Sequence, residues 1–171
     1  MFCDIDGVLA DFVPAACQFF GIKSPKVSPE DQVIFNTIWE SADGWPKLKK
    51  EWPTFWADLD PMPHALELWS EIRPFHPALL SAIPRGWETS QVGKQLWAEK
   101  HLPGFAEDHL RIITGPRSIK KHYAMADDDI PNVLIDDFDK NIEEWTAAGG
   151  IGILYTDGSV DAKNVGELLR G

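Results

Sequence analysis

Short hydrophobic runs alternate with longer segments in which hydrophobic and polar positions are mixed. The runs have the length and composition of buried strands, and they lie at residues 2–5, 78–80, 110–113, 132–135 and 151–155. In the segments between them hydrophobic residues recur at helical spacing, over residues 8–20, 65–72, 89–101, 120–125, 142–148 and 160–169. Strands that alternate with helices favour a parallel sheet covered on both faces. We therefore predict an α/β fold with three layers, of the Rossmann-like kind.

The pattern changes between the first predicted helix and residue 61. Tryptophan and proline are frequent from Trp39 to Trp69, and little of this stretch alternates as strands do. The sequence Pro61-Met62-Pro63 ends it and opens the next helix. We therefore predict a catalytic core of residues 1–17 and 61–171, with residues 18–60 forming a small helical cap inserted after the first strand.

Composition excludes several classes of partner. The chain has 171 residues, of which 44% are hydrophobic, and a net charge of −11. This charge argues against a nucleic-acid duplex or an anionic membrane as partner. No hydrophobic run approaches the ~18 residues of a membrane span, and the start lacks a signal segment. A cytoplasmic protein with a single core is expected.

Aspartates follow two of the predicted strands. Asp4 and Asp6 end the first strand before Gly7 turns the chain, and Asp136-Asp137 follows the strand at 132–135. These residues could be turn formers and helix caps. However, the carboxyl ends of parallel strands meet at one sheet edge, where ligands bind in such folds. Together the four carboxylates form an all-oxygen cluster suited to Mg²⁺.

Several motifs occur in an order that resembles a known superfamily. Four segments are similar, in order, to the four motifs of the haloacid dehalogenase superfamily: Asp4-Ile5-Asp6-Gly7-Val8-Leu9-Ala10-Asp11, Ser81 at the end of the next core strand, a downstream lysine, and Asp136-Asp137. Within it, the segments at residues 55–63, 92–99 and 134–137 resemble the 5'(3')-deoxyribonucleotidases. The resemblance extends from residue 1 to about residue 155.

The resemblance implies a phosphatase mechanism. Asp4 would attack phosphorus and form an aspartyl-phosphate, and Asp6 would protonate the leaving oxygen and later activate water. By the same analogy Mg²⁺ is held by the Asp4 carboxylate, the Asp6 main-chain carbonyl and the Asp137 carboxylate. Asp136 would support the metal ligands without contacting the metal directly. The choice of Asp137 over Asp136 follows from the resemblance and not from the spacing.

The phosphate group needs donors of its own. Ser81 and the backbone N–H of Ala82 are predicted to bind it, although relatives continue this motif as Thr-Ser-Pro and this chain has Ser-Ala-Ile-Pro. Lys120 is the predicted phosphate lysine, with its neighbour Lys121 as the alternative. Lys94 lies between Val92 and Leu96 in a predicted helix, where a solvated surface lysine is expected.

The cap is where specificity is expected. Phe55, Trp56 and Trp39 are the candidates for stacking on a nucleotide base, a contact worth ~1 to 3 kcal/mol per base. Each could equally belong to the cap's own core. With these residues, the expected substrate is a small-molecule phosphomonoester, namely a nucleoside monophosphate.

Other functions compete with this one. A dehalogenase would not be expected to keep Asp6. A polynucleotide-end phosphatase or another small-molecule phosphatase would use the same phosphate site, and a non-catalytic module that binds a nucleotide or Mg²⁺ is a further alternative. The sequence leaves open the preferred base and sugar, the choice between 5' and 3' phosphate, and whether the chain forms a homodimer.

Overall fold

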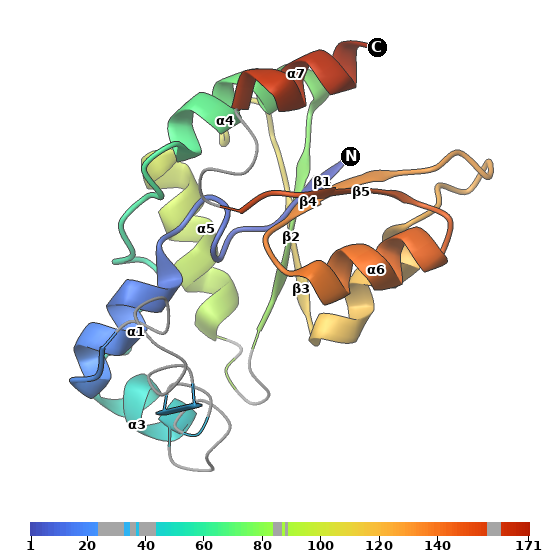
Figure 1. The fold of residues 1–171 in the computed structure, drawn as a ribbon. Coiled ribbons are helices and arrows are strands. Elements are labelled where there is room, and N and C mark those ends of the chain that lie inside the picture. Colours follow the sequence, from blue (N-terminus) through green and yellow to red (C-terminus); the bar gives the residue numbers. More distant parts are fainter. Residues whose placement is uncertain (24–32, 35–36, 38–43, 84–86, 88, 157–161) are drawn as a thin grey trace.

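The computed structural model describes residues 1–23, 33, 34, 37, 44–83, 87, 89–156 and 162–171. Its elements follow the predicted alternation of strand and helix (Figure 1). In chain order they are β1 (Phe2–Cys3), α1 (Phe12–Phe20), α3 (Gly44–Glu51), α4 (Ala65–Ile72), the 3-10 helix η1 (Arg73–Phe75), β2 (Ala78–Ala82), α5 (Thr89–His101), β3 (Ile112–Gly115), the 3-10 helix η2 (Arg117–Tyr123), β4 (Val133–Asp136), α6 (Asp139–Ala147), β5 (Ile151–Leu154) and α7 (Ala162–Arg170).

The five strands form one parallel sheet in the order β3-β2-β1-β4-β5. The central strand β1 has only two residues, Phe2 and Cys3, which pair with β2 on one side and β4 on the other. One further backbone hydrogen bond, from the Asp4 N–H to the Ile135 carbonyl at 2.9 Å, extends this pairing. The α/β prediction is confirmed, and the first strand is shorter than the predicted residues 2–5.

Helices cover both faces of the sheet, and the strands alternate their side chains between two hydrophobic clusters. Cys3, Leu79 and Ile135 face the larger cluster, which also contains residues of α4 and α5. Phe2, Leu80 and Leu134 face the smaller cluster, in which Trp145 of α6 is buried. In Figure 1, α4, α5 and α7 lie on one side of the strands, and α6 lies on the other.

One region predicted as helix differs in extent. The sequence predicts a short helix over residues 120–125, whereas the structure has the 3-10 helix η2, which begins three residues earlier at Arg117 and ends at Tyr123. Pro116 precedes it with extended backbone angles and carries no N–H, which suits the start of a helical turn. The early start places Arg117 and Lys120 one 3-10 turn apart, on the same side of η2.

The described part of the predicted cap contains α3. Two chain segments meet where the predicted cap joins the core: Asp11 N–H donates to the Asp60 carbonyl at 2.8 Å, and Met62 N–H donates to the Leu9 carbonyl at 2.8 Å. The boundaries at residues 18 and 60 stay a prediction, and α1 continues across the first of them.

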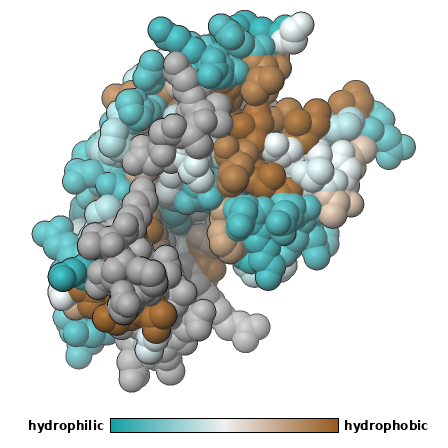
Figure 2. Space-filling view, in the orientation of Figure 1, coloured by the Kyte–Doolittle hydropathy of each residue, from teal (hydrophilic) through white to brown (hydrophobic). Residues whose placement is uncertain are grey.

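The surface in Figure 2 carries hydrophobic residues in the region where Figure 1 draws β5. Ile151 and Leu154 of this edge strand are exposed. Within the described residues, no helix is both long enough and apolar enough to cross a membrane.

Candidate active site

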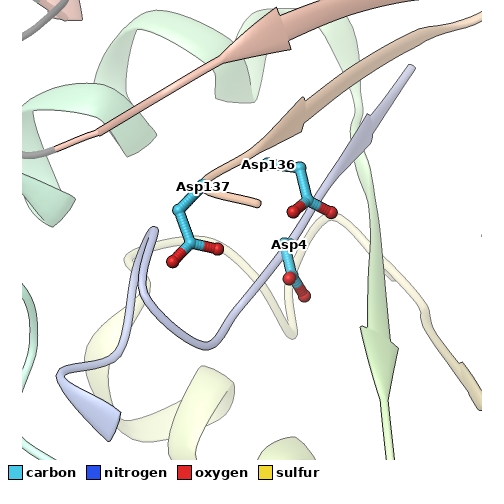
Figure 3. A group of neighbouring side chains, drawn as sticks. All are labelled: Asp4, Asp136 and Asp137. Carbon is cyan, nitrogen blue, oxygen red and sulfur yellow. The ribbon is translucent and has the colours of Figure 1, made fainter. Parts of the chain in front are cut away.

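Three aspartates from the two central strand ends converge on one point. Asp4 follows β1, Asp136 is the last residue of β4, and Asp137 follows it. One carboxylate oxygen from each lies within 4.8 Å of the others. Figure 3 shows the three side chains gathered at this edge of the sheet. Because β1 and β4 are paired in parallel, their carboxyl ends bring these residues together across a sequence separation of more than 130 positions.

Asp136 has its oxygen atoms occupied by protein donors. Its Oδ1 accepts hydrogen bonds from the Phe138 N–H and from Nδ2 of Asn141, each at 3.0 Å. Its Oδ2 accepts from Nδ2 of Asn141 at 3.0 Å and from Nζ of Lys120 at 2.6 Å. Asp136 is fully buried, and these four contacts use the acceptor positions that a metal ion would need.

Asp137 has a different environment. Among the described residues no lysine or arginine pairs with its carboxylate. Burial, together with repulsion from Asp4 and Asp136, raises the pKa of Asp137 to about 7. Its carboxylate lies against Gly7, where a Cβ would stand 2.0 Å from Oδ2. Since Gly7 also has a φ of +81°, this position requires glycine for two independent reasons.

The donor set fits a hard divalent cation. Of the three clustered carboxylates, Asp4 and Asp136 pair with Lys120, and the remaining repulsion would be relieved by further positive charge. Asp4 and Asp137 can each present an oxygen to a metal, whereas Asp136 is engaged by donors. The carboxylate of Asp6 points to Lys94. The third metal contact that the family resemblance implies is the main-chain carbonyl of Asp6. Oxygen-only ligands suit Mg²⁺.

Lys94 is not the surface lysine that the sequence indicated. Its side chain is 1% exposed, and its Nζ lies 2.5 Å from Asp6 Oδ2 and 3.0 Å from Ser81 Oγ. The same ammonium group lies 3.9 Å from the centre of the Trp56 ring. The prediction of a solvated lysine was wrong, because this face of α5 packs on the site.

Asp6 has features suited to moving a proton. Burial raises the pKa of its carboxyl group, while the positive charge of Lys94 opposes that shift. Burial likewise lowers the pKa of Lys94, against the attraction of Asp6. The second oxygen of Asp6, Oδ1, is buried and has no hydrogen-bond partner among the residues that the structure describes. An unpaired buried oxygen is costly, so it marks a position where a ligand atom would be stabilised.

The predicted phosphate donors lie beside these groups. Ser81 is a buried residue of β2, and Ala82 is the last residue of the same strand. The Ile83 N–H that follows donates to the Gly115 carbonyl at 2.9 Å, so it is engaged within the protein. Ser81 and Ala82 thus lie at the carboxyl end of a strand adjacent to β1.

The two candidate lysines of η2 have different positions. Lys120 is 2% exposed, and its Nζ lies 2.7 Å from Asp4 Oδ2 as well as 2.6 Å from Asp136 Oδ2. Although burial disfavours its charge, the two carboxylates raise the pKa of Lys120. Lys121 is exposed. Of the pair, only Lys120 reaches the carboxylate cluster.

The aromatic candidates differ in what the structure describes. Trp39 lies outside the described residues. Phe55 and Trp56 are 0% and 3% exposed, and their rings pack in an aromatic cluster. Trp56 stacks on Phe12 with ring centres 5.3 Å apart, in addition to its contact with Lys94. Both rings are therefore core residues that pack against Phe12 of α1.

Comparisons with known proteins identify a family and a similar fold. The family model described as "5' nucleotidase, deoxy (Pyrimidine), cytosolic type C protein" matches residues 1–162. The chain is also similar in fold to a solved structure of a hydrolase from Streptococcus pneumoniae TIGR4. That similarity has a TM-score of 0.51 at 16% identity and covers 99% of this chain and 96% of the other. A search of curated proteins found no match.

Proposed function

The chain belongs to the 5'-nucleotidase, deoxy (pyrimidine), cytosolic type C family, whose members are phosphoric monoester hydrolases, and we propose that it hydrolyses nucleoside monophosphates through an aspartyl-phosphate on Asp4. The observation that carries this proposal is the position of Asp4. Its carboxylate lies at the end of the central strand, between Lys120 and the carboxylate of Asp137. A nucleophile at the carboxyl end of a parallel sheet is accessible to a ligand and rigidly held.

In the first step, Asp4 attacks phosphorus and displaces the ester oxygen of the nucleoside. A carboxylate is repelled by the phosphate dianion, so the attack needs nearby positive charge. Lys120 supplies part of it from 2.7 Å. Ser81 and the backbone N–H of Ala82 are proposed to bind the phosphoryl oxygens, with Lys94 close to Ser81 at 3.0 Å.

Asp6 is proposed as the proton donor to the leaving oxygen and then as the base that activates water. The raised pKa of its carboxyl group favours the protonated form that the first role needs. Its unpaired Oδ1 supports this assignment, because a protonated carboxyl group there could donate to the ester oxygen. Hydrolysis of the aspartyl-phosphate regenerates Asp4 and releases phosphate.

A divalent metal ion, proposed to be Mg²⁺, would be held by Asp4, Asp137 and the main-chain carbonyl of Asp6. When bound it would neutralise phosphate charge and so permit two anions to approach each other. Asp136 would hold Lys120 in place, because its own oxygens are occupied by donors.

The proposed substrate is a small molecule, with the nucleoside located beneath the cap. The family description names deoxy and pyrimidine nucleotides, and a deoxyribonucleoside monophosphate is therefore the first substrate to test. The same description supports a cytoplasmic location. Trp39 stays a candidate for base stacking, while Phe55 and Trp56 would need a change in their packing before a base could contact their ring faces.

The test is phosphate release from a panel of deoxyribonucleoside and ribonucleoside 5'- and 3'-monophosphates, with Mg²⁺ or with EDTA. We expect turnover that requires the metal and is abolished by Asp4→Asn, which keeps the size of the side chain and removes the nucleophile. Asp139→Asn is the matched control, because Asp139 is an exposed aspartate just after the same cluster. Turnover in EDTA, or turnover retained by Asp4→Asn, would contradict the proposal.

A further inference from the structure

Asn141 lies between Asp136 and an arginine that the mechanism above does not use. Its Nδ2 donates to both oxygens of Asp136 at 3.0 Å, and its Oδ1 accepts from Nη1 of Arg117 at 3.1 Å. A guanidinium group only donates and a carboxylate only accepts. The two neighbours therefore fix the amide of Asn141 in one orientation, with oxygen toward Arg117 and nitrogen toward Asp136.

We infer that Arg117 and Asn141 are positioning residues, which orient the Asp136 carboxylate and through it hold Lys120 against Asp4. This inference rests on the proposed function, in which Lys120 assists attack by Asp4. Neither residue lies within the set of contacts around Asp4 itself, where Lys120 Nζ and the Ile5 N–H are the donors found. Their effect on the reaction passes through Asp136.

The connection between η2 and α6 supports this role. Arg117 begins η2, and Lys120 follows one 3-10 turn later on the same side. Arg117 contacts α6 through Asn141 and through Glu144, whose Oε1 lies 2.8 Å from Nη2. Lys120 contacts the end of β4 through Asp136. Arg117 and Lys120 of η2 thus hydrogen-bond to α6 and to the end of β4, which are adjacent in sequence. These contacts restrict how far Lys120 can move.

Because Asp136 is buried, a change in the orientation of its carboxylate would also move Lys120. Asn141 is 6% exposed and Asp136 is fully buried, so water is not available to replace a lost donor. If Asn141 stops donating, Asp136 keeps Lys120 and the Phe138 N–H as donors. Its carboxylate can then rotate, and the ammonium group of Lys120 shifts with it. Groups that orient catalytic residues in this way typically contribute 10- to 100-fold to activity.

The decisive variant is Asn141→Asp, which has nearly the same shape and keeps an acceptor for Arg117 but removes both donors to Asp136. If Asn141 only filled space, Asn141→Ala would be the more damaging change. We expect the reverse order: kcat falls at least tenfold in Asn141→Asp and less in Asn141→Ala. Arg117→Met should lower kcat about tenfold by freeing the amide to turn, and Arg117→Lys should restore part of the loss.

Arg170→Met is the matched control for loss of a partly exposed arginine. Arg170 pairs with Glu71 at 3.0 Å and lies in α7, and it contacts neither Arg117 nor Asn141. The kcat of the Arg170→Met variant should equal that of the wild type. The double variant Arg117→Met/Asn141→Asp should be no slower than Asn141→Asp alone, because both changes act on one carboxylate. Additive losses, or unchanged kcat in Arg117→Met, would overturn the inference.

A second measurement separates this inference from the proposed function. The ¹⁵N signal of the Lys120 ammonium group, assigned with Lys120→Met, reports its buried ion pairs whether or not the protein turns over a nucleotide. We expect the ammonium protons of Lys120 to exchange slowly with water in the wild type, and the ¹⁵N signal to be lost in Asn141→Asp. Absence of wild-type turnover together with loss of the signal would refute only the proposed function, whereas a signal unchanged in Asn141→Asp would refute the positioning role.

Discussion

Replacing Gly7 by alanine should lower activity strongly while leaving the fold intact. The new Cβ would stand 2.0 Å from Oδ2 of Asp137, and real Cβ contacts below 3.0 Å are essentially never seen. The Asp137 carboxylate must therefore retreat by about 1 Å, away from the point where it meets Asp4. Since a displacement of about 1 Å in a catalytic site can lower activity roughly 100-fold, we expect a loss of that size in kcat/KM.

Backbone strain is a separate effect, and the chain contains a control for it. Gly7 has a φ of +81°, in the left-handed region, where alanine costs roughly 1 to 2 kcal/mol. Gly21, at the end of α1, has a φ of +65° and nothing within 4 Å of its Cβ position. Gly21→Ala should therefore show a similar loss of stability with full activity.

The assay is steady-state hydrolysis of the best nucleoside monophosphate as a function of Mg²⁺ concentration, with thermal unfolding measured in parallel. We expect Gly7→Ala to need more Mg²⁺ for half-maximal activity and to turn over slowly at saturation. Both variants should melt about 2 to 8 °C below the wild type, the range expected for a chain of this size. Wild-type activation by Mg²⁺ in Gly7→Ala, or an equal loss of activity in Gly21→Ala, would refute the reasoning.

Three further predictions concern the buried charges. Lys94→Met should lower kcat at least tenfold, because the carboxyl group of Asp6 loses the ammonium group that lies 2.5 Å away. Lys100 is an exposed lysine of the same helix, and Lys100→Met should match the wild type in the same assay. Lys120→Met should abolish turnover and Lys121→Met should not; equal losses in the two would contradict the assignment of Lys120. Asp136→Asn should lower the free energy of unfolding, measured in urea, by about 1 to 3 kcal/mol, because the buried Lys120 then pairs with Asp4 alone among the described carboxylates. Stability equal to the wild type would show that the ion pair between Lys120 and Asp136 contributes nothing.

The alternation of strands and helices along the chain and the position of the aspartates at strand ends could be predicted because both depend on local signals. Short hydrophobic runs mark the buried strands, and Gly7 marks the turn after Asp4. Once the sheet is parallel, the ends of β1 and β4 must lie at the same edge, so the carboxylate cluster follows from topology. The choice between Asp136 and Asp137 does not follow, because it depends on donors from η2 and α6.

Lys94 shows why the remaining part of the site was missed. Its neighbours Val92 and Leu96 are hydrophobic and exposed, whereas Lys94 itself is buried. Local hydrophobicity therefore indicates the wrong face of α5, and the partner carboxylate is 88 residues away in sequence. A signal was present in the spacing, since Lys94 is three residues before Trp97, a large hydrophobic residue on the buried face.

The charges of the site are arranged so that each lysine is paired before any substrate is present. Lys120 lies between Asp4 and Asp136, and Lys94 contacts Asp6. An unpaired charge at such depth would be unstable, so the resting ion pairs keep both cations in place. A bound phosphate dianion would add negative charge to a cluster in which Asp137 pairs with no lysine or arginine of the described part of the chain. Two lysines beside four carboxylates cannot balance that addition, and a divalent cation held by Asp4 and Asp137 would supply the missing positive charge.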